Sequence, residues 1–317
     1  MFYFKEKINL ILSCGESLID FVPLYDSEGK ISFSPHPGGS TYNVAVAISR
    51  LGVYCGFMGK ISTDFFGDIL VNNLKKNKVE TKFIIRSNDP TTLAFVSIED
   101  GKEPKYAFYN NGSADRNLYI DDIDKSFDDV ECMHFGSYSI AIEPVGNTLF
   151  ELIKKESHNR VISIDPNIRS TLIGNMNEYK AKLEKMISYA SIVKVSSADL
   201  FELYKSENVE ALANEWLKLG LKIVFVTKGG EGAYAATIKA GVSIEGKKIK
   251  VQDTVGAGDT FQGALLVWLK NNGYLIKDKL ADITENDLKE CLLFADKAAS
   301  ITCMREGCNP PFYDELH

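Results

Sequence analysis

Asp253-Thr254-Val255-Gly256-Ala257-Gly258-Asp259-Thr260-Phe261 leads directly into an apolar run that continues to Leu269. Such a run predicts a buried helix, so Gly256, Ala257 and Gly258 stand at or just before its first turn. Small residues at that point let an anion approach the backbone closely, and the unpaired N–H groups and the helix dipole both attract it. The stretch therefore predicts an anion-binding helix start.

Asp259 falls in or beside the first turn of this predicted helix. A carboxylate there competes with a bound anion for the same N–H groups, which favours a chemical role such as a catalytic carboxylate beside the anion. Asp is also a favoured helix cap, so a purely structural role fits the residues equally well. The residues alone leave both interpretations open.

Two other glycine-rich nucleotide motifs are absent from the sequence. No Gly-Lys pair is followed by Ser or Thr, so the chain lacks a P-loop of the Walker A type. Phe261 stands where the dinucleotide fingerprint G-x-G-x-x-G needs its third glycine. The sequence thus disfavours both a P-loop NTPase and a Rossmann-type dehydrogenase.

Strand-like and helix-like segments alternate from Cys132 onward, which indicates an α/β fold with a mostly parallel sheet flanked by helices. We expect strands at 8–12, 132–135, 161–164, 191–195 and 223–226, and helices at 67–77, 144–157, 177–190, across 199–219 and at 285–303. Polar residues follow three successive strands: Asp165, Asn167 and Arg169; Lys194, Ser196 and Asp199; and Thr227, Lys228 and Gly229. Ligands bind beyond the carboxyl ends of parallel strands, so we expect a site at this edge.

The N-terminal part of the chain carries a second group of candidates. The first predicted strand leads to Gly15-Glu16, and an isolated carboxylate, Asp20, follows. Gly38 and Gly39 precede an apolar helix that contains Asn43 and ends at Gly52. Paired glycines let a ligand lie against the backbone, with Asn43 as its hydrogen-bond partner. An ordinary turn carboxylate and a flexible helix entry are the structural alternatives.

Segments 17–36 and 91–115 interrupt the α/β alternation. The second contains two strand-like pieces, 93–98 and 105–109, separated by the hairpin signal Asp100-Gly101. We expect both segments to form a small β lid that excludes water from the site. The chain would then be a single domain, residues 1–317, with the lid inserted in it.

The composition excludes several classes of protein. The chain of 317 residues has a net charge of −7 and no basic run, which argues against nucleic-acid binding. No apolar stretch reaches about 18 residues, which argues against a membrane partner. Six cysteines without a C-x-x-C pair indicate reduced thiols in a cytoplasmic protein. The four histidines lack ligand spacing and disfavour a zinc site.

The stretch Asp253–Phe261 resembles the C-terminal signature of the ribokinase-like (PfkB) family of sugar kinases. The segment from Gly38 to Gly52 is similar to the N-terminal signature of that family, and both Gly15–Pro23 and Asp165–Arg169 resemble its fructokinases. The resemblance extends from about Ile8 to Pro311. It implies the ribokinase-like three-layer fold and a fructokinase that uses ATP and Mg²⁺ to phosphorylate D-fructose.

The resemblance also implies a role for each candidate. Asp259 would be the catalytic base, and the Gly256, Ala257 and Gly258 amides would stabilise the transferring phosphoryl group. The implied sugar site contains Asp20, Gly38, Gly39, Asn43 and Arg169, and the implied nucleotide site contains Lys194, Ser196, Thr227, Gly229 and Gly232. Asp199 would face water-bound Mg²⁺, while Asp253 and the Val255 carbonyl match a monovalent cation site, for K⁺, in some members. The lid is a dimer interface in many members, which implies a homodimer here.

Four positions depart from the family pattern. Asn110 stands where fructokinases commonly have Arg, Asp296 where many have Asn, and Pro311 where ribokinase has a Ser cation ligand. Asp199 stands where the ribokinase pattern has Glu, a conservative change that shortens the reach to water-bound Mg²⁺. These departures leave the exact sugar, the adenine contacts and the use of K⁺ open. The alternatives are a 2-keto-3-deoxygluconate kinase, another ketose or nucleoside kinase of the family, and a non-catalytic regulator that binds nucleotide or sugar.

Overall fold

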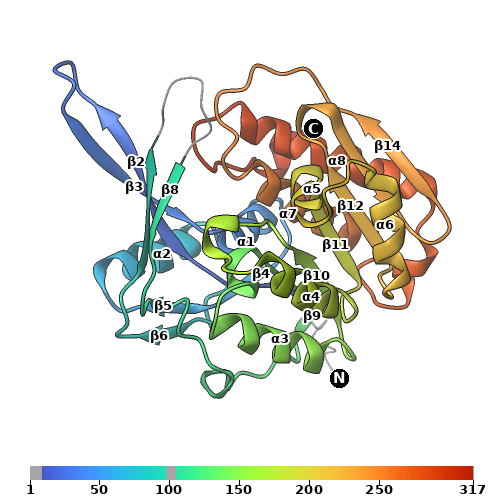
Figure 1. The fold of residues 1–317 in the computed structure, drawn as a ribbon, viewed down its shortest axis with the longest axis horizontal. Helices are drawn as coiled ribbons and strands as arrows, with labels where there is room; N and C mark the ends of the chain where they lie inside the picture. The colour runs from blue at the N-terminus through green and yellow to red at the C-terminus, as the bar shows by residue number, and fades with distance from the viewer. Residues whose placement is uncertain (1–8, 98–104, 317) are drawn as a thin grey trace, which may run out of the picture.

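The computed structural model describes residues 9–97 and 105–316. Its centre is an eight-stranded sheet with the order β14-β13-β12-β11-β10-β9-β1-β4 (Figure 1). The strands are β1 (Leu10–Cys14), β4 (Cys55–Met58), β9 (Val130–Gly136), β10 (Val161–Asp165), β11 (Ile192–Ser196), β12 (Ile223–Thr227), β13 (Gly232–Ala236) and β14 (Gly241–Glu245). All pairs from β4 to β12 are parallel, and β13 and β14 add antiparallel strands at one edge. The predicted mostly parallel sheet is confirmed.

Helices cover both faces of this sheet and make three layers. On β11, Ile192 belongs to one buried apolar cluster and its neighbour Val193 to the other. The first cluster includes side chains of α1 (Ser40–Arg50), α2 (Phe65–Lys76), α7 (Ala257–Asn271) and α8 (Glu285–Cys303). The second includes side chains of α3 (Val145–Glu156), α4 (Met176–Ile187), α5 (Ser197–Tyr204) and α6 (Val209–Lys218). Apolar burial on both sides is the main stabilising contribution to such a sheet.

A second sheet has the order β3-β2-β7-β8, and its β2–β3 hairpin projects from the main body (Figure 1). Its strands are β2 (Leu18–Tyr25), β3 (Ile31–Gly38), β7 (Thr92–Ser97) and β8 (Lys105–Tyr109). The register places Leu18 opposite both Gly38 and Thr92. The segments predicted to form a small β element therefore pair with one another. A separate two-stranded ladder joins β5 (Lys60–Ser62) to β6 (Ile85–Ser87).

The helix segments expected across 199–219 are two helices, α5 and α6, because Lys205 adopts a left-handed conformation with φ 53° and ends α5. One boundary differs from the prediction. The first strand begins at Leu10 instead of residue 8, which lies outside the described residues, as does the predicted Asp100-Gly101 turn. No described helix is long and apolar enough to cross a membrane.

Candidate active site

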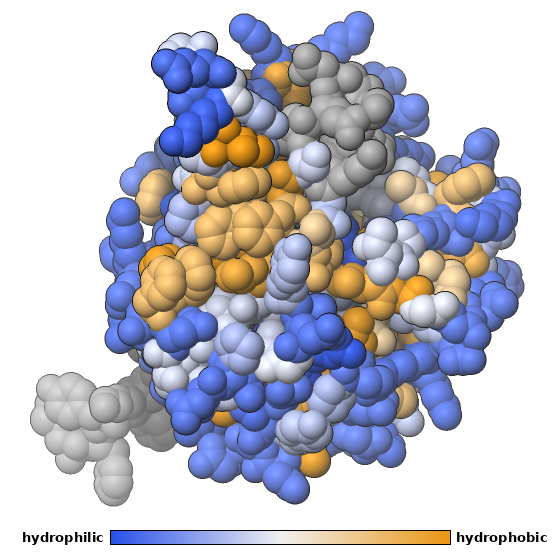
Figure 2. Space-filling model, turned by 60° about the vertical axis from the view of Figure 1, so that its left-hand side comes forward, coloured by the Kyte–Doolittle hydropathy of each residue, from blue (hydrophilic) through white to orange (hydrophobic). Residues whose placement is uncertain are grey.

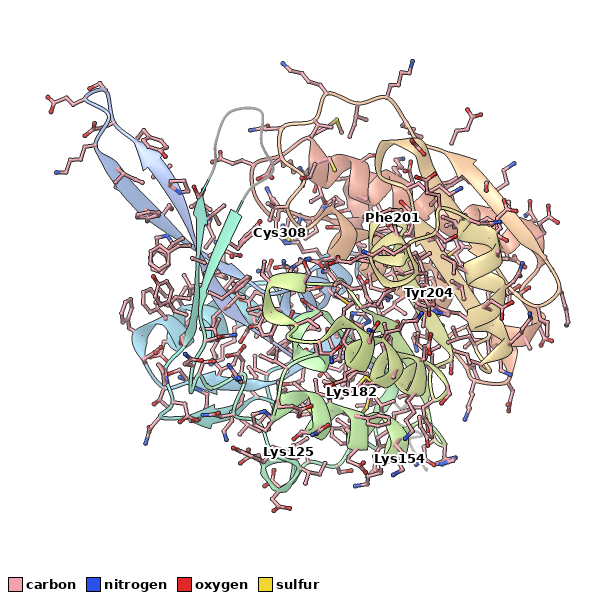
Figure 3. The ribbon with its side chains drawn as sticks, in the orientation of Figure 1. Lys125, Lys154, Lys182, Phe201, Tyr204 and Cys308 are labelled. Atoms are coloured by element: carbon pink, nitrogen blue, oxygen red, sulfur yellow. The ribbon has the colours of Figure 1, made fainter. Side chains whose placement is uncertain are left out.

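The start of α7 has the backbone geometry that its small residues predict. Gly256 is the residue before the first turn and adopts a left-handed conformation with φ 74°. A Cβ atom on Gly256 would lie 2.1 Å from Sγ of Cys308, so glycine is required both by φ and by space. Cys308 lies where the second sheet approaches the main body (Figure 3). Within the described chain no side chain caps α7, and the Ala257 amide donates to the Thr254 carbonyl at 3.2 Å, which leaves the Gly256 and Gly258 amides for an anion.

The Asp259 carboxylate is held by side chains from other elements. Its Oδ1 accepts a hydrogen bond from Oγ of Ser40 at 2.6 Å, and its Oδ2 accepts one from Nδ2 of Asn43 at 2.9 Å. Nδ2 of Asn167 lies 2.9 Å from Oγ of Ser40 and 3.4 Å from Oδ1 of Asp259. Asp259 is buried in the first turn and does not cap its own helix. The geometry therefore removes helix capping as the explanation for this carboxylate.

Ser40 and Asn43 both belong to the first turn of α1. Gly39 precedes this helix with φ 107°, and a Cβ atom there would lie 2.9 Å from the carbonyl oxygen of Glu16. The amide of Ser40 donates to Oε1 of Glu16 at 2.9 Å, and Glu16 is fully buried. The sequence predicts no role for Ser40 or Glu16. Only the three-residue spacing between Ser40 and Asn43 pointed to Ser40, since residues three apart share a helix face, and nothing comparable pointed to Glu16.

A buried ion pair lies beside the start of α7. Nζ of Lys194 is 2.8 Å from Oδ2 of Asp165, and a Cβ atom on Gly258 would lie 3.2 Å from the same Nζ. Burial raises the pKa of Asp165 to about 6 against the opposing effect of Lys194. Burial lowers the pKa of Lys194, but Asp165, Asp199 and Asp259 outweigh it and raise that pKa above its usual value. Lys194 is therefore a permanent cation next to the helix start.

Asp20 faces the same site from β2. A Cβ atom on Gly38 would lie 2.2 Å from Oδ2 of Asp20, so the glycine makes room for this carboxylate. Burial raises the pKa of Asp20 to about 7; Arg169 opposes the shift, and Asp259 adds to it. The Arg169 side chain is exposed, and its Nη1 donates to the Ile168 carbonyl at 3.2 Å. Asp20 therefore lies against Gly38 and close enough to Arg169 and Asp259 for their charges to act on its carboxylate.

The residues expected on the nucleotide side lie at adjacent strand ends. Ser196 ends β11 opposite Thr227 of β12, and Ser196 also caps α5 by accepting the Asp199 amide at 3.0 Å. Oδ1 of Asp199 accepts the Ile168 amide at 3.2 Å. Gly229 and Gly232 adopt φ of 55° and 108°, and a Cβ atom on Gly229 would meet no atom within 4 Å. Residues 229–231 of the β12–β13 turn are exposed, whereas Gly232 is buried and a Cβ atom there would lie 2.1 Å from the Ile244 carbonyl oxygen of β14.

The residues expected to bind a monovalent cation have backbone partners. Oδ1 of Asp253 accepts the Val255 amide at 3.0 Å, and Oδ2 accepts the Gly307 amide at 2.9 Å. Within residues 9–97 and 105–316, no group of three or more His, Cys, Asp or Glu side chains is arranged to hold a metal ion. Oδ1 of Asp165 is buried and lacks a hydrogen-bond partner in the described chain, which leaves one free oxygen donor beside Lys194.

Comparison with known proteins gives a consistent result. A family model described as pfkB family carbohydrate kinase matches residues 9–315. A fructokinase of Rhizobium leguminosarum bv. trifolii is 38% identical over 280 residues, which is 88% of this chain and 86% of the relative. A crystal structure of fructokinase with bound ATP from Xylella fastidiosa has a TM-score of 0.88 and 28% identity, and the match covers 97% and 96% of the two chains.

A second solved structure is a fructokinase double mutant from Vibrio cholerae O395 in fructose, ADP and potassium ion bound form. It has a TM-score of 0.83 and 26% identity, and the match covers 95% of this chain and 94% of that one. These structural matches confirm the ribokinase-like fold class that the sequence predicts.

Proposed function

Because this chain belongs to the pfkB family of carbohydrate kinases and is an ATP-dependent sugar kinase, we propose that it is a fructokinase. It would transfer the γ-phosphoryl group of ATP to a primary hydroxyl of D-fructose and release ADP. The observation that carries the proposal is the Asp259 carboxylate, which three side chains from distant segments hold at the start of α7. The identity to curated fructokinases supports the choice of sugar.

Asp259 would act as the general base. Its carboxylate accepts the proton of the attacking sugar hydroxyl while that oxygen bonds to the γ-phosphorus and the bond to the β-phosphate oxygen breaks. A loose phosphoryl transition state requires little deprotonation early, so positioning matters more than base strength. The bonds from Ser40 and Asn43 supply that positioning because they fix both carboxylate oxygens.

The start of α7 would stabilise the transferring group. The N–H groups of Gly256, Ala257 and Gly258 carry the positive end of the helix dipole, and charge on the γ-phosphate oxygens would face them. Lys194 adds a full positive charge at Gly258. Ser196, Thr227, Gly229 and Gly232 would contact the remainder of the nucleotide at the ends of β11 and β12.

Mg²⁺ would enter with ATP, because this ion keeps several waters and binds chiefly through substrate phosphates. Asp199 and the free oxygen of Asp165 are the oxygen donors that fit it. When bound, the ion neutralises charge on the phosphates. A K⁺ ion at Asp253 and the Val255 carbonyl remains a prediction for activity assays with and without K⁺.

Asp20, Gly38, Gly39, Asn43 and Arg169 would form the sugar site. Asp20 offers two oxygens to sugar hydroxyls, and the exposed guanidinium of Arg169 can turn toward the substrate. Asn110 is buried directly after β8, where fructokinases commonly have an Arg that would contact the sugar or stiffen the lid. A 2-keto-3-deoxygluconate kinase or a nucleoside kinase therefore remains the second candidate.

The second sheet would serve as the lid and as the contact surface of a homodimer. Its outer face is apolar, as the patch in Figure 2 shows, and Tyr25, Ile31, Phe33, Phe65 and Tyr109 are exposed there or on adjacent α2. Ile31 lies opposite Tyr25 and Phe33 opposite Pro23, so these side chains share one face. An apolar patch of this kind marks a protein contact, and light scattering of wild type and Phe33→Glu tests it. A monomeric wild type would overturn the dimer.

ADP release with Mg-ATP across a panel of acceptors tests the function. The panel contains fructose, glucose, mannose, ribose, 2-keto-3-deoxygluconate and adenosine, each with and without K⁺. A dominant fructose signal is expected. A larger signal with another acceptor would replace fructose but retain the kinase mechanism, and absence of turnover with every acceptor would favour a non-catalytic regulator.

A further inference from the structure

Glu16 is a fully buried carboxylate that the proposed mechanism does not use. It lies between β1 and β2, and in the described part of the chain it has no ion-pair partner. Oε1 of Glu16 accepts the Ser40 amide at 2.9 Å, and Oε2 lies 3.4 Å from Oγ1 of Thr41. The same Thr41 hydroxyl donates to the Glu16 carbonyl at 3.0 Å. Glu16 therefore forms hydrogen bonds with the first two residues of α1 through both its side chain and its backbone.

A buried carboxylate without a cation is costly unless hydrogen bonds and dipoles offset the burial. The positive end of the α1 dipole and the Ser40 amide supply that offset at Glu16. Burial raises the pKa of Glu16, the Ser139 hydroxyl and the Ser40 amide oppose the shift, and the nearby Asp115 carboxylate adds to it. A neutral residue would fill the same space at a lower cost, so the carboxylate calls for a role beyond packing.

The first turn of α1 connects Glu16 to the reacting groups. The Ser40 amide donates a hydrogen bond to Oε1 of Glu16, and the Ser40 hydroxyl donates one to Oδ1 of Asp259 at 2.6 Å. Asn43, three residues further along the same first turn, donates to Oδ2 of Asp259. A shift of this turn would move both hydrogen bonds together.

We propose that Glu16 is a positioning residue that sets the orientation of Asp259 through Ser40 and the first turn of α1. The role rests on the proposed function of Asp259. Glu16 does not touch the sugar or ATP; it fixes the helix start that holds the base.

The first experiment compares Glu16→Ala and Glu16→Gln with wild type, with fructose and Mg-ATP as substrates. Glu16→Ala should lower kcat about 10²-fold, as expected for a small misplacement of a catalytic group. Glu16→Gln retains an acceptor oxygen for the Ser40 amide and should recover kcat to within about tenfold of wild type. KM for Mg-ATP should change less than twofold in both. Equal losses in the two variants, or a loss confined to KM, would overturn the role.

Asp115 supplies a matched control. It is also a fully buried carboxylate with a raised pKa caused by burial, but it accepts Thr92 and Tyr138 hydroxyls and does not touch α1. Asp115→Asn should lower the free energy of unfolding but change kcat by less than about threefold at neutral pH, whereas Glu16→Ala should lower both. Equal losses of kcat in the Asp115→Asn and Glu16→Ala variants would show that Glu16 acts only through stability.

A double-mutant cycle tests the route through Ser40. Once Ser40→Ala has removed the hydrogen bond to Asp259, Glu16→Ala should lower kcat by less than threefold. The reason is that the effects of substitutions at neighbouring residues in one network are not additive. Full additivity of the two losses would overturn the route.

A double-mutant cycle between Glu16→Ala and Asp259→Asn can be measured by urea unfolding, which does not require catalytic activity. A non-additive change in the unfolding midpoint is expected even if fructose proves to be the wrong substrate. Failure of the proposed function would appear as an inactive wild type. Failure of this inference would appear as additive changes in the urea unfolding midpoint.

Discussion

Oδ2 of Asp259 lies 2.9 Å from Nδ2 of Asn43, although the two residues are 216 positions apart in the sequence. The contact joins the first turn of α7 to the first turn of α1. It makes two helix starts, each preceded by a glycine with positive φ, parts of one site. The proposed chemistry depends on this junction, because α7 supplies the Asp259 carboxylate and α1 supplies the Ser40 and Asn43 side chains that orient it.

Asp259→Ala should lower kcat by at least about 10²-fold, the general range for loss of a base. Binding of ATP should persist, because the helix start and Lys194 remain. Steady-state kinetics and calorimetric titration with a non-hydrolysable ATP analogue measure the two properties. Asp259→Asn keeps the size of the side chain but cannot accept a proton, so it should lose as much turnover as the Ala variant. Turnover within about threefold of wild type in either variant would exclude Asp259 as the base.

Asp20 should make fructose binding depend on pH. Its pKa of about 7 means that the free enzyme holds this side chain largely protonated below pH 7 and ionised above it. If the carboxylate is the form that accepts sugar hydroxyls, KM for fructose should fall as pH rises from 6 to 8. Asp20→Asn should abolish that dependence while raising KM. A KM that varies with pH in the same way in both proteins would assign the dependence to another group.

The raised pKa of Asp20 also predicts that the stability of the protein falls as pH rises, whereas fructose binding should strengthen. A folded-state pKa of about 7 against an ordinary value of 3.8 means that the folded protein binds more protons between these values. The stability that Asp20 contributes is therefore present below about pH 4 and is lost as pH rises through 7. The difference between these two pKa values corresponds to at most about 4 kcal/mol, so Asp20→Asn should have a higher free energy of unfolding in urea than wild type at pH 8 by up to that amount, and nearly the same value at pH 4. No difference at pH 8 would contradict the buried site for this carboxylate.

Gly256 should not tolerate a side chain. Gly256→Ala combines a left-handed φ of 74° with a Cβ atom 2.1 Å from Sγ of Cys308. Gly273 has the same φ of 74° but no atom within 4 Å of such a Cβ, so Gly273→Ala measures the backbone strain alone, about 1 kcal/mol. Thermal unfolding should show a clearly larger loss for Gly256→Ala, and Cys308→Gly should restore part of it. Equal losses at the two glycines would mean that Cys308 moves away freely.

Local sequence patterns predicted much of this architecture. The alternation of strands and helices, the apolar run after Gly258 and the polar residues at three strand ends all follow from local chemistry. The strands β13 and β14 were not predicted, because the sequence of β13, Gly-Ala-Tyr-Ala-Ala, contains residues that are depleted in strands. Only pairing with the buried edge of β12 makes this segment extended.

The partners of Asp259 were predictable only in part. Asn43 was a candidate because it follows two glycines, and Asn167 because it follows a strand. Ser40 carried no comparable signal, since Ser at a helix start commonly serves as a cap. Its hydroxyl instead reaches Asp259, which depends on how α1 and α7 pack and cannot be read from either segment alone.

The buried pair of Lys194 and Asp165 leads to a last prediction. Asp165→Asn would leave Lys194 buried beside Gly258 without its main counter-ion, and breaking one partner of a buried pair costs about 3–5 kcal/mol. The variant should therefore unfold at lower urea, and the effect should diminish in the double variant Asp165→Asn/Lys194→Met, which removes both charges. A second pair, Glu156 and Arg160, is 2.7 Å apart with side chains 6% and 12% exposed; Glu156 is the last residue of α3 and Arg160 follows that helix. Glu156→Gln should reduce stability but leave KM for Mg-ATP unchanged, whereas the double variant at 165 and 194 should raise that KM because it removes the cation at the helix start. An unchanged KM in the double variant would show that Lys194 and Asp165 have only a structural role.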